Sequence, residues 1–272
     1  DGSNSSQGVS QEEFLMRDEM YRARLQALRS EELSLMKERE RLDLEKTRHI
    51  AELRRLRDEE ASRFSATPVL GGRYVLQHLL GRGGFSEVYK AFDVVELREV
   101  ACKIHQLNTA WNEAKKQNYV KHTVREYNIH RQLDHANVVR LYDVFEIDTN
   151  TFCTVMDFCE GGDLDAHLKE NKMLCEREAR SIIVQIFAGL SYLADPRRRV
   201  IHYDLKPGNI IFDRHGLAKI TDFGLSKVME QEDASMIDLT SQGAGTYWYL
   251  PPECFETGPR PPPISNKGDV WA

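Results

Sequence analysis

The chain has 272 residues, 41% of them hydrophobic, which is enough for one sizeable domain with its own core and an appendage. Its 37 basic and 43 acidic side chains give a formal net charge of −6, a balance that argues against general nucleic-acid binding. The five cysteines are scattered and include no Cys-x-x-Cys pair, which argues against a disulfide framework or a zinc site. The sequence has no apolar run of membrane-spanning length and no signal-peptide pattern at its start, so we expect a soluble intracellular protein.

The N-terminal part of the chain is expected to contain a disordered head and a helix. Residues 1–10 are rich in Gly, Ser, Asn and Gln, a composition typical of disorder. About half of residues 11–63 are charged, and none is Pro or Gly. Apolar side chains recur there at heptad spacing, with one shift of phase before the last three: Tyr21, Leu25, Leu28, Leu35, Leu42, Ile50, Leu53 and Leu56. Two interpretations remain open, a coiled coil that forms a homo- or heterodimer and a lone solvated helix, since charged residues occupy several seam positions.

Five short motifs follow a linker, which Pro68, Gly71 and Gly72 predict over residues 64–73. In chain order they are Gly-Arg-Gly-Gly-Phe-Ser (81–86), Val-Ala-Cys-Lys (100–103), His-Tyr-Asp-Leu-Lys-Pro-Gly-Asn (202–209), Asp-Phe-Gly (222–224) and Pro-Pro-Glu (251–253). Each motif alone recurs by chance, but their order and separations resemble the protein-kinase signature set. We therefore predict an α+β, two-lobed protein-kinase fold over residues 74–272, preceded by an α-helical coiled coil.

The glycine-rich motif lies between two short apolar runs, residues 75–80 and 87–92, which predict a β-hairpin whose tip covers ATP. Because glycines carry no side chain, the backbone there can approach the phosphates closely. Ser86 stands where a third glycine often occurs, and Phe85 is expected to cap the tip and exclude water. The predicted ATP-binding residues in and near this hairpin are Gly81, Gly83, Gly84, Phe85, Ser86, Val88 and Ala101.

Lys103 ends the second motif and is predicted to hold the α- and β-phosphates of ATP. Its ammonium group needs a carboxylate that keeps it in place. Glu126 is the candidate, on an amphipathic stretch from about residue 112 to residue 133 that predicts a helix. Glu113 is the alternative, but it lies near the expected helix start.

Residues 154–159 resemble the strand and hinge that lie behind the adenine base in kinases. Met156 would then guard the back of the pocket, and the backbone from Asp157 to Cys159 would pair with the base. Asp163 is placed to reach a ribose hydroxyl, although a capped helix start would give the same pattern. Ile211 completes the predicted nucleotide site.

The third and fourth motifs supply the predicted catalytic groups. Asp204 is the candidate base that orients the substrate hydroxyl and accepts its proton, and Lys206 can neutralise charge on the transferred phosphoryl group. Asn209 and Asp222 are the predicted magnesium ligands. Thr246 would bridge Asp204 and Lys206, an arrangement that resembles serine/threonine rather than tyrosine kinases.

Longer runs narrow the resemblance to the Tousled-like serine/threonine kinases. The similar segments are residues 103–108, 125–130 and 239–255, together with Tyr203 where most kinases have Arg. The resemblance covers roughly residues 46–271, and it implies a nuclear kinase that dimerises through coiled coils and acts on histone chaperones in chromatin assembly. Because Tyr203 cannot bind a phosphate as that Arg does, we expect phosphorylation of the candidate sites Ser235, Thr240 and Ser241 to work by another route.

The two ends of the sequence lead us to expect a fragment. It begins without Met and stops at Ala272, within an expected helix that starts near Asp269. That helix would be the central post of a truncated C-terminal lobe, against which five side chains would pack: Ile182, Ile183, Ile186, Phe187 and Leu190. With the rest of the lobe absent, we expect the chain to be unstable, aggregation-prone or chaperone-bound. The alternative function is then a catalytically inactive product that acts as a coiled-coil dimerisation or inhibitory module.

Overall fold

The computed structural model describes residues 10–66, 69–108, 110–171, 173–223, 227–228, 246–255 and 265–272, some of them by their backbone alone. The chain divides into two compact units, Asp1–Arg54 and Arg55–Ala272, and each is described by itself. The predicted disordered head lies outside the described residues except for Ser10.

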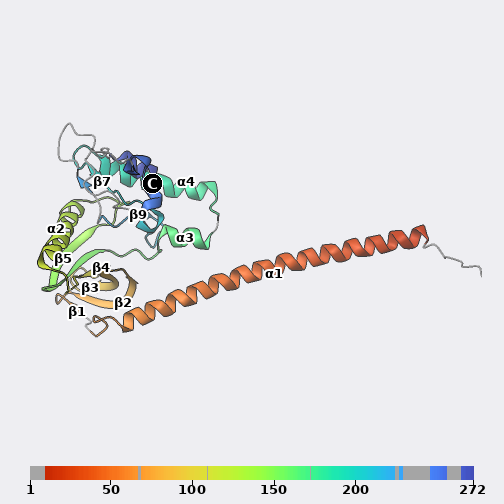
Figure 1. Cartoon of the computed structure of the whole chain (residues 1–272), viewed down its shortest axis with the longest axis horizontal. Coiled ribbons are helices and arrows are strands. Elements are labelled where there is room, and N and C mark those ends of the chain that lie inside the picture. Colours follow the sequence, from red (N-terminus) through yellow and green to blue (C-terminus); the bar gives the residue numbers. More distant parts are fainter. Residues whose placement is uncertain are drawn as a thin grey trace, which may run out of the picture. The chain divides into compact units, whose positions relative to one another are not determined.

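The described part of the first unit is helical and belongs to α1, which extends over Gln11–Glu60 and so ends before the predicted residue 63 (Figure 1). A capping box starts this helix: the Glu13 N–H donates to Ser10 Oγ at 3.2 Å, and the Ser10 N–H donates to Glu13 Oε2 at 3.3 Å. No residue of α1 is buried. The heptad side chains are therefore exposed in the single chain, and the coiled coil stays a prediction.

The second unit begins with a fully antiparallel six-stranded sheet of order β1-β2-β3-β4-β6-β5. Its strands are β1 (Val69–Leu70), β2 (Tyr74–Arg82), β3 (Ser86–Asp93), β4 (Arg98–Gln106), β5 (Leu141–Asp148) and β6 (Thr151–Asp157). Within the predicted linker over residues 64–73, Phe64 and Leu70 are 4% and 3% exposed and belong to the core of this sheet. Burial of these two apolar side chains stabilises the packing of Phe64 and Leu70 on the sheet.

Helix α2 (Glu113–His130) follows β4 and ends before the predicted residue 133. Leu133 nevertheless remains buried beside Ile129 in the core of the helical part of the unit. The side chains of several α2 residues, Glu126 among them, lie outside the described residues.

The remaining elements are mostly short. Among them, α4 and β7 lie at the opposite end of the unit from β1–β3 (Figure 1). They are α3 (Leu164–Glu170), α4 (Glu176–Ala194), β7 (Val200–Ile201), η1 (Pro207–Asn209), β8 (Ile210–Phe212), β9 (Ala218–Ile220), β10 (Lys227–Val228), η2 (Tyr247–Tyr249), η3 (Pro252–Phe255) and α5 (Lys267–Trp271). On α4, the predicted core residues Ile182, Ile186 and Leu190 are buried. Ile183 and Phe187 are not, since they remain 49% and 46% exposed.

Helix α4 has buried apolar residues on one side and exposed apolar residues next to them, and it is only 19 residues long. Across the described part of the chain, no helix combines the length and the apolar character that crossing a bilayer requires.

Candidate active site

A buried aspartate from the last helix fixes the backbone of the loop that carries the catalytic motif. Asp269 of α5 is 5% exposed, and its two carboxylate oxygens accept the N–H groups of His202 and Tyr203, both at 2.8 Å. Tyr203 has φ of 68°, a left-handed conformation that is unfavourable for a residue with a side chain. The two N–H bonds hold that conformation, and burial raises the pKa of Asp269 despite them.

The Tyr203 side chain turns into the protein. It is 7% exposed, and its hydroxyl lies 3.7 Å from Cys254 Sγ. Burial raises the pKa of this hydroxyl, so it stays neutral. A buried neutral phenol has no cation to offer a phosphate, which agrees with the functional difference from Arg that the sequence predicts.

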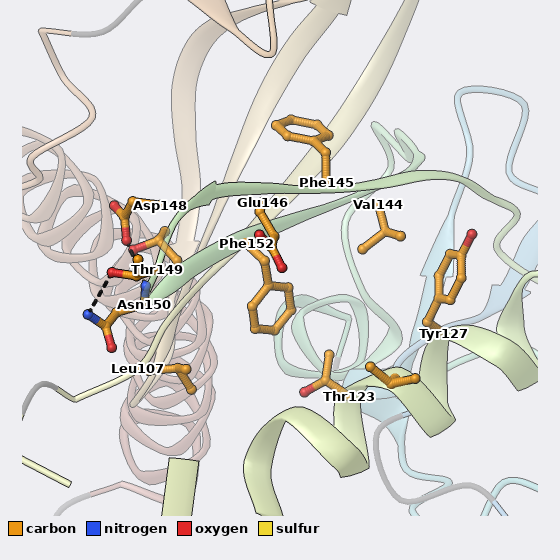
Figure 2. Close-up of a pocket in the computed structure, with 12 residues that line it drawn as sticks. Leu107, Thr123, Tyr127, Val144, Phe145, Glu146, Asp148, Thr149, Asn150 and Phe152 are labelled. Atoms are coloured by element: carbon orange, nitrogen blue, oxygen red, sulfur yellow. Dashed lines mark hydrogen bonds between the residues drawn. The ribbon is translucent and has the colours of Figure 1, made fainter. Parts of the chain in front are cut away.

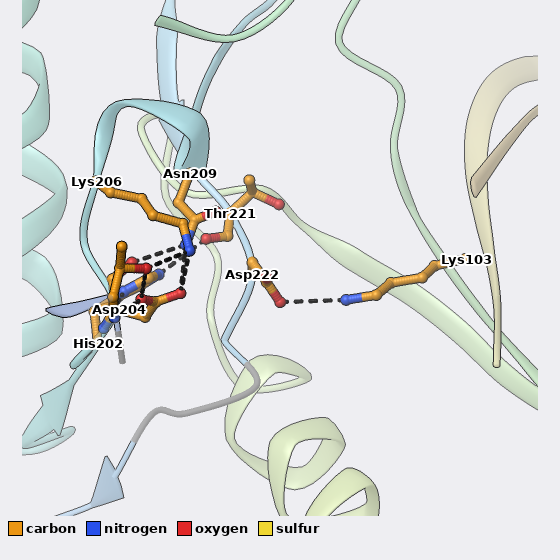
Figure 3. A network of polar contacts seen from close by, with 8 residues as sticks. Lys103, His202, Asp204, Lys206, Asn209, Thr221 and Asp222 are labelled. Atoms are coloured by element: carbon orange, nitrogen blue, oxygen red, sulfur yellow. Dashed lines mark hydrogen bonds and ion pairs between the residues drawn. The ribbon is translucent and has the colours of Figure 1, made fainter. Parts of the chain in front are cut away.

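Asp204 is the centre of a hydrogen-bond network formed by its own loop and by Thr246 (Figure 3). Lys206 Nζ donates to Asp204 Oδ2 at 2.7 Å and to Thr246 Oγ1 at 2.8 Å. Thr246 donates to Asp204 Oδ1 from its N–H at 2.9 Å and from its hydroxyl at 2.8 Å. Asn209 Nδ2 donates to the Asp204 carbonyl at 2.8 Å and to Oδ2 at 3.2 Å. The carboxylate is thus held as an acceptor whose orientation is fixed on both oxygens.

Three aromatic rings pack together beside this loop. His130 of α2 and Phe223 lie 4.7 Å apart between ring centroids, and Phe223 and His202 lie 5.1 Å apart. His202 Nε2 lies 2.9 Å from the Thr221 carbonyl oxygen, and the Asp204 N–H donates to Nδ1 at 3.3 Å. In this arrangement Nε2 donates to the Thr221 carbonyl and Nδ1 accepts from the Asp204 N–H.

Burial keeps the His130 ring neutral. Its Nε2 lies 2.6 Å from the Val139 carbonyl oxygen, and the residue is 4% exposed. Burial lowers the pKa of His130 to about 4, against a smaller opposing effect of the Val139 carbonyl. The His130 ring is therefore uncharged at neutral pH.

Lys103 and Asp222, which are 119 residues apart in sequence, form an ion pair with Nζ 3.2 Å from Oδ1 (Figure 3). Desolvation raises the pKa of Asp222, but the charge and hydrogen bond of Lys103 lower it by more, so the pKa lies below its usual value. Asp222 has φ of 65°, so its backbone too adopts the left-handed conformation. The pairing of Lys103 with Glu126 stays a prediction, whereas the alternative Glu113 lies 3.5 Å from Lys116 of its own helix.

The predicted glycine-rich hairpin is formed by β2 and β3. Its tip closes through a 2.7 Å hydrogen bond from the Gly83 N–H to the Ser86 carbonyl. Gly81 and Lys103 both register with Val88, one on each side of β3, so the hairpin is tied directly to the strand of the phosphate-binding lysine. Gly84 lies in the tip. Phe85, 47% exposed, packs edge-on against Trp111 at 4.8 Å between ring centroids.

The predicted adenine-binding residues lie on neighbouring strands. Ala101 and Met156 are register partners on β4 and β6. The Asp157 N–H donates to the Arg140 carbonyl at 3.0 Å, so this N–H is not available to a base. Burial raises the pKa of the Cys159 thiol to about 12, which keeps it protonated at neutral pH.

Asp163 caps the N-terminus of α3, because its Oδ1 accepts the Ala166 N–H at 2.8 Å. This is the capped helix start that the sequence left open as an alternative to a ribose contact. Its backbone also forms a bridge with Ile211 of β8. The two predicted nucleotide-site residues are therefore neighbours, and the ribose contact of Asp163 stays a prediction.

The donor set at Asn209 and Asp222 fits magnesium. Among the described residues, no three His, Cys, Asp or Glu side chains gather as a metal cluster. Asn209 uses its amide nitrogen on Asp204, which leaves its oxygen as an acceptor, and Lys103 contacts Oδ1 of Asp222 and leaves Oδ2. Hard oxygen ligands from one or two side chains, completed by phosphates and water, are what Mg²⁺ accepts in nucleotide sites.

A separate cavity of about 400 Å³ lies between α2 and strands β5 and β6 (Figure 2). Tyr127 and Thr123 of α2 face Val144 and Phe152 across it. None of the predicted site residues lines this cavity, so it is distinct from the catalytic network.

Comparison with known proteins decides the family. Residues 74–272 match the protein kinase domain. The chain belongs to the protein kinase family. The network around Asp204 and the Lys103–Asp222 pair lie within the matched region, and the catalytic roles of these residues stay predictions.

Within this family, the chain is similar to Tousled-type serine/threonine kinases. It is 55% identical to the serine/threonine-protein kinase TOUSLED of Arabidopsis thaliana over 100% of its own length and 39% of that protein. It is 53% identical to the human tousled-like 2 kinase over 100% of its length and 36% of that protein, and 56% identical to the zebrafish (Danio rerio) tousled-like 1-B kinase over 96% and 35%. The chain thus spans well under half the length of these relatives. The resemblance to Tousled-like serine/threonine kinases inferred from the motifs is confirmed.

Sequence reasoning missed two functional positions. The role of Asp269 was not foreseen, although its position in an Asp-Val-Trp helix start was a signal, and its contacts lie 66 and 67 residues upstream. The contact between the His130 and Phe223 rings was also missed, because the apolar period of a helix does not show which ring its side chains will contact. The candidate phosphosites Ser235, Thr240 and Ser241 lie outside the described residues.

Proposed function

We propose that this protein transfers the γ-phosphate of Mg-ATP to serine and threonine hydroxyls of protein substrates. The observation that carries the proposal is the Asp204 network, in which Lys206 and Thr246 hold both carboxylate oxygens as acceptors. A base that is oriented before the substrate arrives needs no reorganisation during the reaction.

The chain's own groups would act in a simple sequence. Asp204 accepts the hydrogen bond of the substrate hydroxyl and takes its proton as the hydroxyl oxygen bonds to the γ-phosphorus. The bond from that phosphorus to the β–γ bridging oxygen breaks at the same time, and ADP leaves. Lys206, already 2.7 Å from Asp204, neutralises charge that develops on the transferred phosphoryl group. Lys103 orients the α- and β-phosphates. When bound, magnesium would be held by Asn209 and Asp222 and would neutralise phosphate charge.

The non-enzymatic alternative is not favoured. An inactive dimerisation module would have no reason to keep a complete proton-acceptor network at Asp204 or the Lys103–Asp222 pair. Both are present, and the family match extends over the region that contains them.

Substrate, location and assembly are proposals that rest on the resemblance to Tousled-like kinases. We infer histone chaperones as the substrate class, a nuclear location with a role in chromatin assembly, and dimerisation through the helix Gln11–Glu60. The identity of 53–56% with three Tousled-type kinases supports these proposals.

The test of the activity is radiolabelled phosphate transfer from Mg-ATP to a histone chaperone, with an Asp222→Ala variant as the blank. Transfer that exceeds the blank and appears on serine or threonine supports the proposal. A chain that binds Mg-ATP but transfers nothing to any protein hydroxyl contradicts it.

The pairing of α1 is tested separately by sedimentation equilibrium. Replacing Leu28, Leu35 and Leu42 with Asp should convert a dimer into a monomer, because a charge on the seam opposes burial of the apolar stripe. The matched control places Asp at three exposed positions off the seam: Ser30, Lys37 and Ala51. A monomer before any substitution would contradict pairing of this chain with itself.

A further inference from the structure

The segment immediately upstream of the kinase match packs into the same unit as the glycine-rich hairpin. The match starts at residue 74, whereas the unit starts at Arg55. Ser62 and Phe64 are 5% and 4% exposed, and Phe64 belongs to the core of the sheet. We call residues 58–64, which begin in the last turn of α1, the brace.

Two side chains of the brace reach the two residues that flank the glycine-rich tip. Ser62 Oγ donates to Glu87 Oε2 at 2.6 Å, and Asp58 Oδ1 lies 3.9 Å from Arg82 Nη1. Arg82 and Glu87 are register partners across β2 and β3, and Arg82 Nε lies 3.4 Å from Glu87 Oε1. The four side chains therefore connect the brace to both strands at the base of residues 83–86.

The alternation of β3 explains why Glu87 depends on the brace. Ser86 and Val88 lie on the partly exposed face of this strand, whereas Glu87 and its neighbour Tyr89 lie on the buried face. A carboxylate that is 3% exposed is unfavourable unless donors surround it. Ser62 supplies such a donor, and the Phe64 N–H donates to Ser62 Oγ at 3.1 Å and so fixes the hydroxyl.

The loss of this donor would act on the hairpin. Without Ser62 Oγ, the Glu87 carboxylate gains by turning toward water, and any such movement shifts the strand that carries Ser86 and Val88. Both of these are predicted nucleotide-binding residues, and Val88 is also the register partner of Lys103.

We infer that Ser62 is a positioning residue for nucleotide binding, which acts through Glu87 and Arg82 to hold the glycine-rich hairpin in the conformation that covers ATP. The inference rests on the proposed function, because it requires the hairpin to cover a nucleotide. Ser62 does not touch the nucleotide, so its loss changes nucleotide affinity and leaves the phosphoryl-transfer step itself unchanged.

The experiment compares Ser62→Ala with Ser65→Ala in the full chain. Ser65 lies in the same turn, but its hydroxyl donates to the Ser62 carbonyl at 2.9 Å and not to the hairpin. Affinity is measured by titration with a fluorescent ATP analogue. Amide hydrogen exchange, read by mass spectrometry, is followed in residues 81–86 and in β6 as the reference.

We expect Ser62→Ala to raise the Kd of the analogue about tenfold, the lower end of the effect of losing one hydrogen bond to a charged group, and to speed exchange in residues 81–86 but not in β6. Ser65→Ala should match the unmodified chain in both measurements. Where transfer is measured, Ser62→Ala should raise the KM for ATP and leave kcat unchanged.

Equal Kd values for the two variants would overturn the inference, and so would faster exchange in β6 to the same extent as in the hairpin, since that indicates general loss of stability. Asp58→Ala is the second variant, because its side chain is 45% exposed and its loss will not unfold the sheet. It should change both measurements in the same direction by a smaller amount, and no change in either variant contradicts the role. An unmodified chain that binds no nucleotide would contradict the proposed function as well.

Discussion

At the scale of single residues, Asp204 is more constrained than a surface carboxylate needs to be. It accepts hydrogen bonds from Lys206, Thr246 and Asn209, so both oxygens are oriented. Such preorganisation is costly to assemble and useful only if the group acts as an acceptor in the reaction.

Replacing Asp204 with Asn should lower kcat by about 10²–10⁴-fold, because an amide cannot take the substrate proton. Affinity for an ATP analogue should stay within about twofold, since Asp204 is placed to face the substrate hydroxyl. Steady-state transfer assays and a binding titration measure the two effects. Asp165→Asn on the exposed surface of α3 is the matched control, and equal kcat values for the two variants would contradict the role of Asp204.

His130 gives the molecule an acid-sensitive stability. Its pKa is about 4 in the folded state because burial disfavours the charged ring, against an ordinary value of 6.5. Between these values the unfolded chain binds a proton that the folded chain does not, so stability falls as pH falls from 6.5 toward 4 and is fully regained above 6.5. At pH 5 the expected loss is about 2 kcal/mol.

The measurement is the free energy of unfolding at pH 7 and pH 5. His130→Gln should reduce the difference between the two values, because the titrating group is gone. His215→Gln, at an exposed turn, should leave the difference as it is. His105, whose pKa burial lowers to about 3, will maintain part of the acid sensitivity in both variants.

Sequence reasoning works best at this scale where a motif fixes both residue type and spacing. Asp204, Lys206 and Asn209 are close in sequence, so their grouping follows from one short loop. Asp269 is different, because its carboxylate meets the loop only after α5 has docked, and no local pattern encodes that event.

At the scale of elements, the packing of α4 on β9 depends on a glycine. A Cβ added at Gly189 would lie 2.8 Å from Ile220 Cδ1 and 2.9 Å from the Asn137 carbonyl oxygen. Gly189→Ala gains up to about 1 kcal/mol of helix propensity, but overpacking against backbone costs about 1–3 kcal/mol.

We therefore expect Gly189→Ala to lower the free energy of unfolding, as measured by urea titration. Ser181→Ala, on the exposed face of the same helix, should leave stability unchanged or raise it slightly. A more stable Gly189→Ala variant would show that the backbone at Asn137 can move away.

Phe64 anchors the segment upstream of the kinase match, and Phe64→Ala should cost about 3–5 kcal/mol of stability. The reason is its burial, at 4% exposure, within the core of the six-stranded sheet. The control is Phe14→Ala on α1, where the ring is 66% exposed and its loss should change stability by less than about 0.5 kcal/mol. Thermal unfolding of both variants makes the comparison, and similar melting temperatures would contradict the anchoring role.

The hairpin and α2 could be predicted to within a few residues, because their apolar periodicity is clear. The anchoring of Phe64 could not, since one aromatic residue between charged and small neighbours has no period. Its burial depends on a sheet that forms from residues 69–157, which is information that lies outside the segment itself.

At the scale of the whole molecule, α4 leaves apolar side chains in contact with water. Ile183, Val184 and Phe187 lie on one side of the helix and are 49%, 61% and 46% exposed. Adjacent exposed apolar groups of this size favour association. The 272-residue chain should therefore self-associate and bind a hydrophobic dye, as light scattering and dye fluorescence can show.

Ile183→Lys combined with Phe187→Glu should reduce both signals without loss of the folded state. Val95→Lys, in the turn between β3 and β4 where the side chain is 63% exposed, should leave them unchanged. A cooperative thermal transition with monomeric behaviour in the unmodified chain would contradict this prediction.

The fold class could be read from the sequence because five motifs in order specify one domain family. The exposed residues of α4 could not, since a helical pattern shows which positions are apolar but not which of them another element covers. Ile182 is buried and its neighbour Ile183 is exposed because of the rotation about its own axis at which α4 packs.

The positions of the five cysteines make this protein suited to site-specific labelling. Cys102, Cys153 and Cys254 are buried, and the Cys159 thiol, with a pKa of about 12, has almost no reactive thiolate at neutral pH. Cys175 is exposed immediately before α4. A maleimide fluorophore or spin label should thus attach at one defined point without any engineered substitution, so that the native chain can report on its own movements.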